Sequence, residues 1–218
     1  MNILGRVIRK FRTIQRERNF KRWFAIDGDN TRRLTYSLSS ESIVFDLGGY
    51  KGDFAHEISK AYGCFVYLYE PVEKFHSFAV ERFAAQPKVY CMKYGLSDEA
   101  GEFKITDDDN SSSVVTAGQD DTLETVQIKA FSTEVDDLNI QSIDLLKINV
   151  EGSEFSILPH LVESGCIKKV KNIQVQFHHF VPDAYRRRRE IQKMLSMTHD
   201  LEWCYPFVWE SWSIRTVE

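Results

Sequence analysis

Short apolar runs alternate with amphipathic segments over most of the chain beyond residue 40. The runs SIVFD, FVYLY and IDLLKINV are nearly continuous in apolar residues, which is typical of strands buried on both faces of a parallel sheet. The pattern predicts strands at Ser42–Asp46, Phe65–Tyr69, Lys88–Met92, Ile143–Val150 and Asn172–Phe177. It predicts helices that end near Tyr62 and Ser164, and others at Glu73–Ala85 and Asp183–Thr198. Such an alternation predicts a doubly wound α/β sheet that binds ligands at the carboxyl ends of its strands.

Two regions depart from this alternation. Glu102–Thr106 and Gln127–Phe131 alternate like an inserted hairpin, and the polar segment Asp107–Gln119 between them is rich in Asp, Asn, Ser and Gly. We interpret that segment as a solvated loop rather than a cation site. Near the end of the chain, Glu202–Tyr205 and Trp212–Arg215 predict an antiparallel hairpin.

The N-terminal segment has a basic amphipathic pattern. Apolar residues recur at helical spacing and predict a helix over residues 3–24: Ile3, Leu4, Val7, Ile8, Phe11 and Ile14. We therefore divide the chain into a helical arm, residues 1–39, and a main domain, residues 40–218. The apolar stripe of the arm either docks on an anionic membrane surface or packs against the main domain or a second subunit.

Charge is distributed unevenly along the chain. Residues 1–33 contain ten Lys and Arg against three acidic residues, a net charge of +7. Because the whole chain carries −4, the remainder carries −11. An acidic main domain argues against nucleic acid as a partner.

Composition narrows the class of protein. The chain has 218 residues, of which 43% are hydrophobic and 28% charged, as in soluble globular domains. We expect neither a membrane-spanning helix nor a signal peptide, because apolar runs are short and charges occur throughout the first 25 positions. The four cysteines are scattered, so we expect free thiols, no zinc site and a cytoplasmic location, with or without a peripheral membrane contact.

The first cluster with chemical potential follows the first strand of the main domain. Asp46 enters a turn that contains Gly48, Gly49 and Gly52, and Glu70 ends the next strand. Glycines allow a sharp turn and a close approach of a ligand to the backbone. An acidic residue about 20 positions further on suits hydrogen bonds to two ribose hydroxyls. This layout predicts a site for an adenosine-containing cofactor.

The identity of that cofactor depends on the turn. The GxGxxG pattern of nicotinamide dinucleotide sites is absent. The acidic Asp46 suits an ammonium group better than a phosphate, and S-adenosylmethionine carries both an ammonium group and a ribose. A nicotinamide-dependent oxidoreductase remains the alternative enzyme, because it would share the sheet and Glu70.

The second cluster, KINVEGSE, ends the fourth predicted strand. Lys147 inside a buried strand needs a partner, because an unpaired charge resists desolvation. Glu151 and Glu154 are the candidate partners by their nearness in sequence. The alternative is a lysine whose ammonium group reaches water and a glutamate that merely begins a helix.

These motifs together resemble the FkbM-type S-adenosylmethionine-dependent methyltransferases, from about Ser42 to His179. The turn DLGGYKG resembles the family's D-x-G-A-N-x-G, and Glu70-Pro71 resembles its E-P. LLKINVEGSE is the most specific match, to L-K-I-D-V-E-G-x-E. Further matches are Gly95-Leu96-Ser97-Asp98, TEVDDL and QVQFH.

The resemblance implies a class I methyltransferase (Rossmann-like) fold. Its sheet would be doubly wound, mostly parallel and seven-stranded, with an antiparallel C-terminal hairpin. It also implies S-adenosyl-L-methionine as cofactor and a hydroxyl of a sugar, glycan or related small molecule as acceptor. By matching position, it implies the following cofactor-binding residues: Asp46, Gly48, Gly49, Gly52, Glu70, Pro71, Gly95, Leu96 and Asn149.

The same resemblance, with the chemistry of methyl transfer, indicates candidate catalytic residues. An alcohol must lose its proton during methyl transfer, so a base helps, and our candidates are His178, then Glu151, then Glu154. Lys147 and Asn149 complete the candidate catalytic set. Asn149 stands where the family commonly has Asp, and Gln176 stands where an acid is frequent. A non-catalytic module that only binds the cofactor is therefore a second alternative.

Two further sets of side chains leave open alternatives. The aromatic residues near the C-terminus either stack on a sugar or pack in the core: Trp203, Tyr205, Phe207, Trp209 and Trp212. Arg186–Arg189 either bind an acidic substrate or form a solvated helix face.

Overall fold

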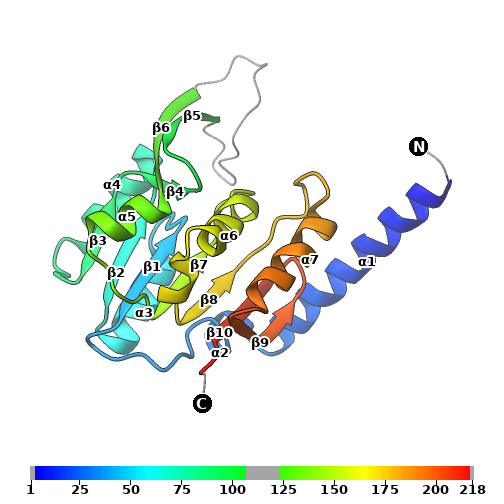
Figure 1. The fold of residues 1–218 in the computed structure, drawn as a ribbon, viewed down its shortest axis with the longest axis horizontal. Coiled ribbons are helices and arrows are strands. Elements are labelled where there is room, and N and C mark those ends of the chain that lie inside the picture. The colour runs from blue at the N-terminus through cyan, green and yellow to red at the C-terminus, as the bar shows by residue number, and fades with distance from the viewer. Residues whose placement is uncertain (1–2, 107–122, 217–218) are drawn as a thin grey trace.

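The computed structural model describes residues 3–106 and 123–216 of the protein. Seven strands form one sheet in the order β3-β2-β1-β7-β8-β10-β9 (Figure 1). Neighbouring strands from β3 to β8 are parallel, whereas β10 is antiparallel to both β8 and β9. The strands are β1 (Ile43–Leu47), β2 (Phe65–Tyr69), β3 (Val89–Met92), β7 (Leu145–Ile148), β8 (Asn172–Val175), β9 (His199–Tyr205) and β10 (Trp209–Ile214). This confirms the predicted mostly parallel seven-stranded α/β sheet with an antiparallel C-terminal hairpin.

Helices cover both faces of the sheet because each central strand is apolar on both faces. The helices are α3 (Asp53–Tyr62), α4 (Glu73–Phe83), α5 (Phe131–Asp137), α6 (Glu154–Glu163) and α7 (Ala184–Leu195), with a 3₁₀ turn η1 (Cys166–Lys169). Phe45 and Leu47 of β1 point into the hydrophobic cluster with α5, α6 and α7, while Val44 points into the cluster with α3 and α4. The sheet is therefore the middle of three layers, and a hydrophobic cluster lies between it and the helices on each face.

A second, three-stranded sheet stands beside the ends of β1 and β2. Its order is β4-β6-β5, with β4 (Gly95–Ser97) parallel to β6 (Leu123–Ala130) and β5 (Gly101–Thr106) antiparallel to β6. The predicted hairpin is therefore present, and β4 adds a strand that the alternation of residues did not indicate. The predicted loop Asp107–Gln119 lies outside the described residues.

The N-terminal arm consists of α1 (Ile3–Ala25), the short α2 (Gly28–Thr31) and an extended segment. Trp23 of α1 packs against Trp203 and Tyr205 of β9, with ring centroids 5.5 and 5.2 Å apart. The remainder of α1 extends away from the body (Figure 1). None of the described helices is long and apolar enough to cross a membrane.

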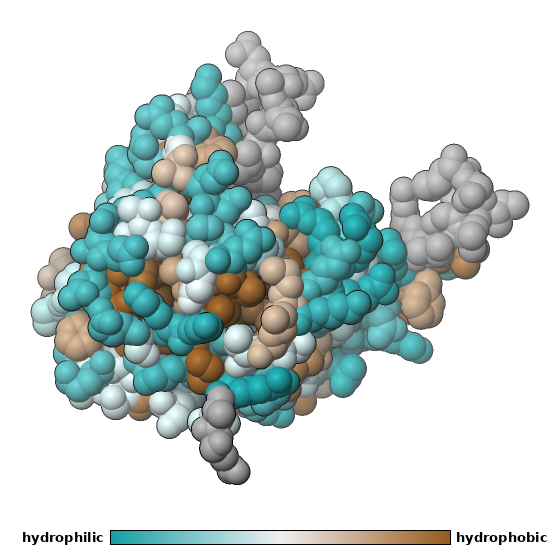
Figure 2. All heavy atoms as spheres, viewed as in Figure 1, coloured by the Kyte–Doolittle hydropathy of each residue, from teal (hydrophilic) through white to brown (hydrophobic). Residues whose placement is uncertain are grey.

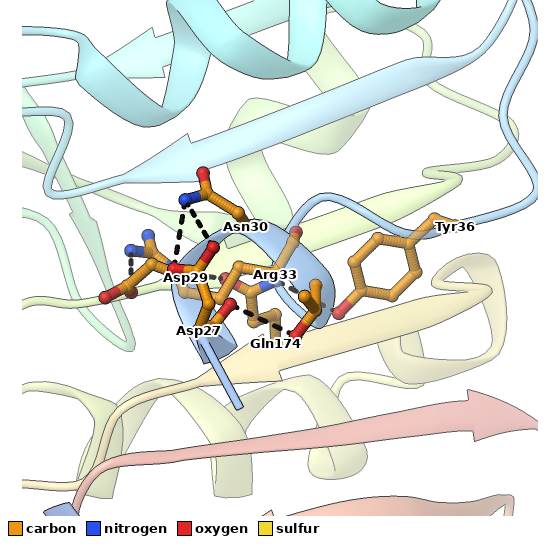
Figure 3. Close-up of polar contacts among 7 residues, drawn as sticks. Asp27, Asp29, Asn30, Arg33, Tyr36 and Gln174 are labelled. Atoms are coloured by element: carbon orange, nitrogen blue, oxygen red, sulfur yellow. Dashed lines mark hydrogen bonds and ion pairs between the residues drawn. The ribbon is translucent and has the colours of Figure 1, made fainter. Parts of the chain in front are cut away.

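The segment after α2 is fastened to β8 by polar contacts. Arg33 donates from Nε to Oε1 of Gln174 at 3.0 Å, and the Gln174 amide donates to the Arg33 carbonyl at 2.9 Å (Figure 3). The Tyr36 hydroxyl lies 3.0 Å from the same amide and 3.0 Å from the hydroxyl of Ser211 in β10. These contacts satisfy the buried Gln174 side chain and fix the arm to the sheet.

One strand is shorter than its apolar pattern predicted. The expected strand ran from Ile143 to Val150, but β7 ends at Ile148. The Asn149 amide still donates to the Leu47 carbonyl at 3.1 Å, and its own carbonyl oxygen lies only 1.9 Å from where a Cβ on Gly48 would be. The β1 and β7 loops therefore cross directly beyond the ends of their strands.

Candidate functional site

A cavity of about 860 Å³ opens where β1, β2 and β7 end beside the small sheet. Gly48, Glu70 and Asn149 line it from the main sheet. Gly95 and Leu96 of β4, together with Phe103 of β5, line it from the small sheet. The cavity therefore lies at the carboxyl ends of the parallel strands, where ligands bind in doubly wound folds.

The turn after β1 depends on glycine for both its conformation and its space. Gly48 has φ +73° and Gly52 has φ +78°, a region that favours glycine. A Cβ at Gly48 would lie 1.9 Å from the Asn149 oxygen, and one at Gly52 would lie 2.5 Å from the Phe83 ring. Gly48 lines the cavity, whereas Gly49 and Gly52 do not and serve to shape the turn.

Glu70 links the turn to the second strand. Its Oε2 accepts a hydrogen bond from the Tyr50 amide at 2.8 Å, and its Oε1 accepts one from the Val72 amide at 3.0 Å. The side chain is 5% exposed, and this burial raises the pKa of Glu70 despite the two amide donors. Glu70 lines the cavity, and each of its carboxylate oxygens can accept a further hydrogen bond, as binding to neighbouring ribose hydroxyls requires.

Asp46 and Lys147 form a buried ion pair beneath the turn. Nζ of Lys147 lies 2.7 Å from Oδ1 of Asp46 and donates to the carbonyl oxygens of Leu47 and Gly48 at 3.3 and 2.8 Å. Burial lowers the pKa of Lys147, and Asp46 opposes that shift. The expected pairing of Lys147 with Glu151 or Glu154 is wrong, because Asp46 occupies the register position beside it on the neighbouring strand.

This pairing also changes the role open to Asp46. Its side chain is fully buried, its charge faces Lys147, and it does not line the cavity. The carboxylate therefore supports the turn from behind. The ammonium-binding role predicted for Asp46 stays a prediction.

Asn149 presents the polar atom that fits a ligand in the cavity. Its Oδ1 is buried and has no hydrogen-bond partner among the described residues. A buried acceptor of this kind costs free energy unless a donor reaches it. The ammonium group of S-adenosylmethionine is such a donor. Gly48 lines the cavity where the cofactor would approach the backbone, and the Glu70 carboxylate can accept hydrogen bonds from the ribose. The residues present therefore fit this cofactor.

A histidine that follows β8 lies between two carboxylates that follow β7. Nδ1 of His178 lies 3.1 Å from Oε1 of Glu154, and Nε2 lies 3.4 Å from Oε1 of Glu151. Burial lowers the pKa of His178, but hydrogen bonds to Glu151 and Glu154 outweigh it and raise the pKa to about 9. His178 is therefore a cation at neutral pH, which removes the lone pair that a general base needs.

Glu154 and Glu151 differ in position although they are three residues apart. Glu154 is fully buried; it accepts from the Gly152 and His178 amides at 2.8 and 2.7 Å and does not line the cavity. Glu151 lines the cavity with its side chain 30% exposed, and it adopts φ +48°, which is rare for a residue with a Cβ. Only Glu151 of the three predicted bases reaches the cavity.

The structure thus brings most of the predicted site residues to one place. Those that line the cavity are Gly48, Glu70, Pro71, Gly95, Leu96, Asn149 and Glu151. Those that support it from behind are Asp46, Gly49, Gly52, Lys147, Glu154 and His178. Gln176 does not line the cavity either, so its departure from the family pattern lies outside the cavity wall.

Some cavity residues were not predicted from the sequence. Tyr50, Asp98, Ser156 and Phe180 line the cavity. Burial raises the pKa of Asp98, but hydrogen bonds from Ser97 and its own amide hold that pKa below its usual range. Asp98 is the last residue of the Gly95-Leu96-Ser97-Asp98 match, from which only Gly95 and Leu96 were assigned to the site. Phe180 stands two residues after the QVQFH match, which assigned it no role.

The remaining candidates take structural roles. Trp203, Tyr205 and Trp209 pack with Trp23 of α1 rather than lining the cavity. Arg188 is buried and forms an ion pair with Glu210, so the arginine run is not wholly a solvated face. Among the described residues, no group of three His, Cys, Asp or Glu side chains is placed to hold a metal ion.

Comparison with known proteins gives a consistent picture. The model of the "Methyltransferase FkbM domain" family matches residues 46–201. No curated protein matches the chain. The fold is similar to methyltransferase FkbM from Methylobacillus flagellatus KT (TM-score 0.55, 13% identity), covering 85% of this chain and 46% of that one. This chain therefore spans less than half the length of that protein.

Two shorter solved structures show the same fold. One is an rRNA methylase from Streptococcus thermophilus, with TM-score 0.50 and 10% identity, covering 82% of this chain and 90% of that one. The other is a putative methyltransferase from Streptococcus mutans in complex with SAH, with TM-score 0.50 and 9% identity, covering 82% of this chain and 91% of that one. At these identities the likeness concerns the fold alone.

Proposed function

The chain belongs to the FkbM methyltransferase family, and from that premise we propose that it transfers a methyl group to a hydroxyl of a sugar, glycan or related small molecule. The cofactor of a methyltransferase of this fold is S-adenosylmethionine, which supplies an electrophilic methyl group on a sulfonium. The observation that carries the proposal is the cavity wall itself, in which Gly48, Glu70 and the unpartnered Oδ1 of Asn149 adjoin.

In this proposal the residues on the cofactor side of the cavity only bind and orient the cofactor. Glu70 would accept hydrogen bonds from the ribose hydroxyls, and Oδ1 of Asn149 would accept one from the ammonium group. Gly95 and Leu96 would flank the adenine. Lys147 donates to the carbonyls of Leu47 and Gly48, which fixes the backbone of the turn before the cofactor would bind.

The acceptor side handles the proton. We assign to Glu151 the hydrogen bond from the acceptor hydroxyl, because it is the candidate base that lines the cavity. His178 acts as a positioning residue: its imidazolium, anchored by Glu154, holds Glu151 by charge and hydrogen bond. A carboxylate that orients a hydroxyl and receives its proton contributes about 10²–10⁴-fold to such reactions.

Methyl transfer to a panel of hydroxyl acceptors, measured with methyl-labelled S-adenosylmethionine, tests this assignment. We expect Glu151→Gln to lower kcat about 100-fold while the affinity for S-adenosylhomocysteine stays within threefold of the parent. Glu163→Gln, an exposed carboxylate at the end of α6, is the matched control and should leave both unchanged. Unchanged kcat in Glu151→Gln, or label recovered on nitrogen, would contradict the proposal.

A specific observation keeps a second function in view. Asn149 cannot accept a proton as an aspartate does, so the second candidate function is cofactor binding without turnover. Restoring the family residue with Asn149→Asp separates the two functions. Tight binding of S-adenosylhomocysteine without turnover in either version would favour the non-catalytic module.

A further inference from the structure

The two halves of α1 have different surroundings. In the second half, Asn19 and Trp23 are each 2% exposed and face β9 and β10. In the first half, Val7, Phe11 and Ile14 are 59%, 66% and 43% exposed. Figure 2 shows apolar residues on the surface of this projecting arm, which Figure 1 identifies as α1. The first half therefore carries exposed apolar side chains that the described part of the chain does not cover.

These three side chains form a stripe that points away from the body. Residues four and three positions apart fall on one side of a helix, so Val7, Phe11 and Ile14 align. At about 100° per residue, Asn19 and Trp23 lie about 120° and 160° around the helix from Val7. The stripe is thus not the continuation of the surface that packs on the sheet.

Basic residues accompany the stripe. The helix Ile3–Ala25 contains eight Lys and Arg against one acidic residue, a net charge of +7. By the same helical geometry, Lys10, Arg18 and Lys21 lie on the stripe's side of the helix, and all three are exposed. An apolar stripe among cations is typical of helices that lie in the interface of an anionic membrane.

We propose that the outer face of α1, centred on Val7, Phe11 and Ile14, docks on an anionic lipid surface. Pairing of this face with the α1 of a second copy would bring two helices of charge +7 together. Nucleic acid would satisfy the cations but would leave the apolar stripe in water. A membrane interface accepts both, because acyl chains bury the stripe while anionic headgroups meet the cations.

Docking there would hold the cavity wall near the membrane. The Arg12 guanidinium lies 4.1 Å over the Tyr185 ring, so this part of α1 packs beside the first turn of α7. Phe180, Val181 and Pro182 of the segment between β8 and α7 line the cavity, and Phe180 is 54% exposed. The segment that lines the cavity therefore leads directly into the helix on which α1 packs.

Flotation with lipid vesicles tests the proposal on the full chain. We expect binding to vesicles of 70% phosphatidylcholine and 30% phosphatidylglycerol, and about 100-fold weaker binding to pure phosphatidylcholine. Each basic residue near an anionic surface contributes about fivefold, so binding should also weaken as salt rises. No binding to the anionic vesicles would overturn the proposal.

Two pairs of substitutions make the test specific. Phe11→Glu with Ile14→Glu removes the stripe and should weaken vesicle binding about 100-fold. Met197→Glu with Leu201→Glu makes the same charge change at residues 73% and 45% exposed elsewhere, and should leave binding nearly unchanged. An equal loss of vesicle binding in both double variants would overturn the proposal, because net charge alone would then explain the loss.

A third double variant and two further measurements test the other possible partners of this face, nucleic acid and a second copy of the chain. Lys10→Glu with Arg18→Glu keeps the stripe and should weaken binding about 100-fold, with the Tm of the parent showing that the body still folds. Tighter binding to RNA than to vesicles, or a dimer that Phe11→Glu with Ile14→Glu dissociates while vesicle binding persists, would overturn the lipid assignment. These readouts do not depend on methyl transfer, so the proposed function can fail independently.

Discussion

The loops that follow β1 and β7 meet at one edge of the sheet, yet they are fixed by different means. The β1 loop is held by backbone conformation and buried contacts: Gly48 has φ +73°, and Lys147 binds its carbonyl beneath it. The β7 loop is held by charge, with the His178 imidazolium between Glu151 and Glu154. The first arrangement suits a fixed cradle, and the second suits a group that exchanges protons.

The difference also concerns solvent. Asp46 and Lys147 are 0% and 3% exposed, whereas the Glu151 side chain is 30% exposed and lines the cavity. His178 has a pKa raised to about 9, so its charge changes within an accessible pH range. We therefore expect the β1 loop to respond to burial and steric changes and the β7 loop to respond to pH.

The largest expected effect is at the buried ion pair. Lys147→Met leaves Asp46 buried without its partner, so we expect the free energy of unfolding to fall by about 3–5 kcal/mol in urea titrations. The matched control is Lys171→Met, because Lys171 pairs with Asp144 at the same 2.7 Å but is 54% exposed. Such a surface pair contributes about 1 kcal/mol or less. Similar losses in both variants would show that burial does not distinguish the two pairs.

The next effect is a pH dependence carried by His178. Because the folded state raises its pKa from 6.5 to about 9, the stabilisation is fully present below pH 6.5 and is lost as pH rises through 9. The corresponding free energy is about 3 kcal/mol. We expect unfolding curves of the parent and His178→Gln to converge over this pH range. A difference between the two proteins that stays constant from pH 6 to 9.5 would contradict the assignment.

A smaller effect, measured at two glycines, separates the cost of backbone strain from the cost of steric crowding. Gly48 and Gly165 both have positive φ, +73° and +79°, but nothing lies within 4 Å of a Cβ at Gly165. Gly165→Ala should cost about 1 kcal/mol from backbone strain alone. Gly48→Ala should cost about 2 kcal/mol more, because the Asn149 oxygen must move. Thermal unfolding of the two variants measures the difference, and equal Tm values would mean that the loops do not cross as closely as described.

Much of the fold was predictable because the central strands are apolar on both faces and the helices are periodic. Val44 and Phe45 are adjacent in sequence, and each enters a different core cluster, so the run around them could only be a doubly covered strand. The same logic placed the end of the fourth strand at Val150, whereas β7 ends at Ile148. Strand β4 was missed because its three residues are too few to show any period.

The site was predictable only as far as its residues follow strands in sequence. Glu70 and Glu151 end strands that meet at one edge, so their placement follows from topology. The partner of Lys147 did not follow, because sequence proximity favoured Glu151 while strand register supplied Asp46. The charge state of His178 also depended on contacts across the β7 and β8 ends, which no spacing in the sequence encodes.

The contrast between the two loops is tested most directly by calorimetric titration of S-adenosylhomocysteine into Glu70→Ala and His178→Gln at pH 7.5. We predict about 100-fold weaker binding in Glu70→Ala, because two hydrogen bonds to a buried carboxylate are lost. We predict a change of less than about threefold in His178→Gln, because His178 contacts Glu151 and does not line the cavity. Equal affinities in the two variants, whether both weakened or both unchanged, would contradict the assignment of the cofactor to Glu70 and to the β1 loop that its carboxylate binds through the Tyr50 amide.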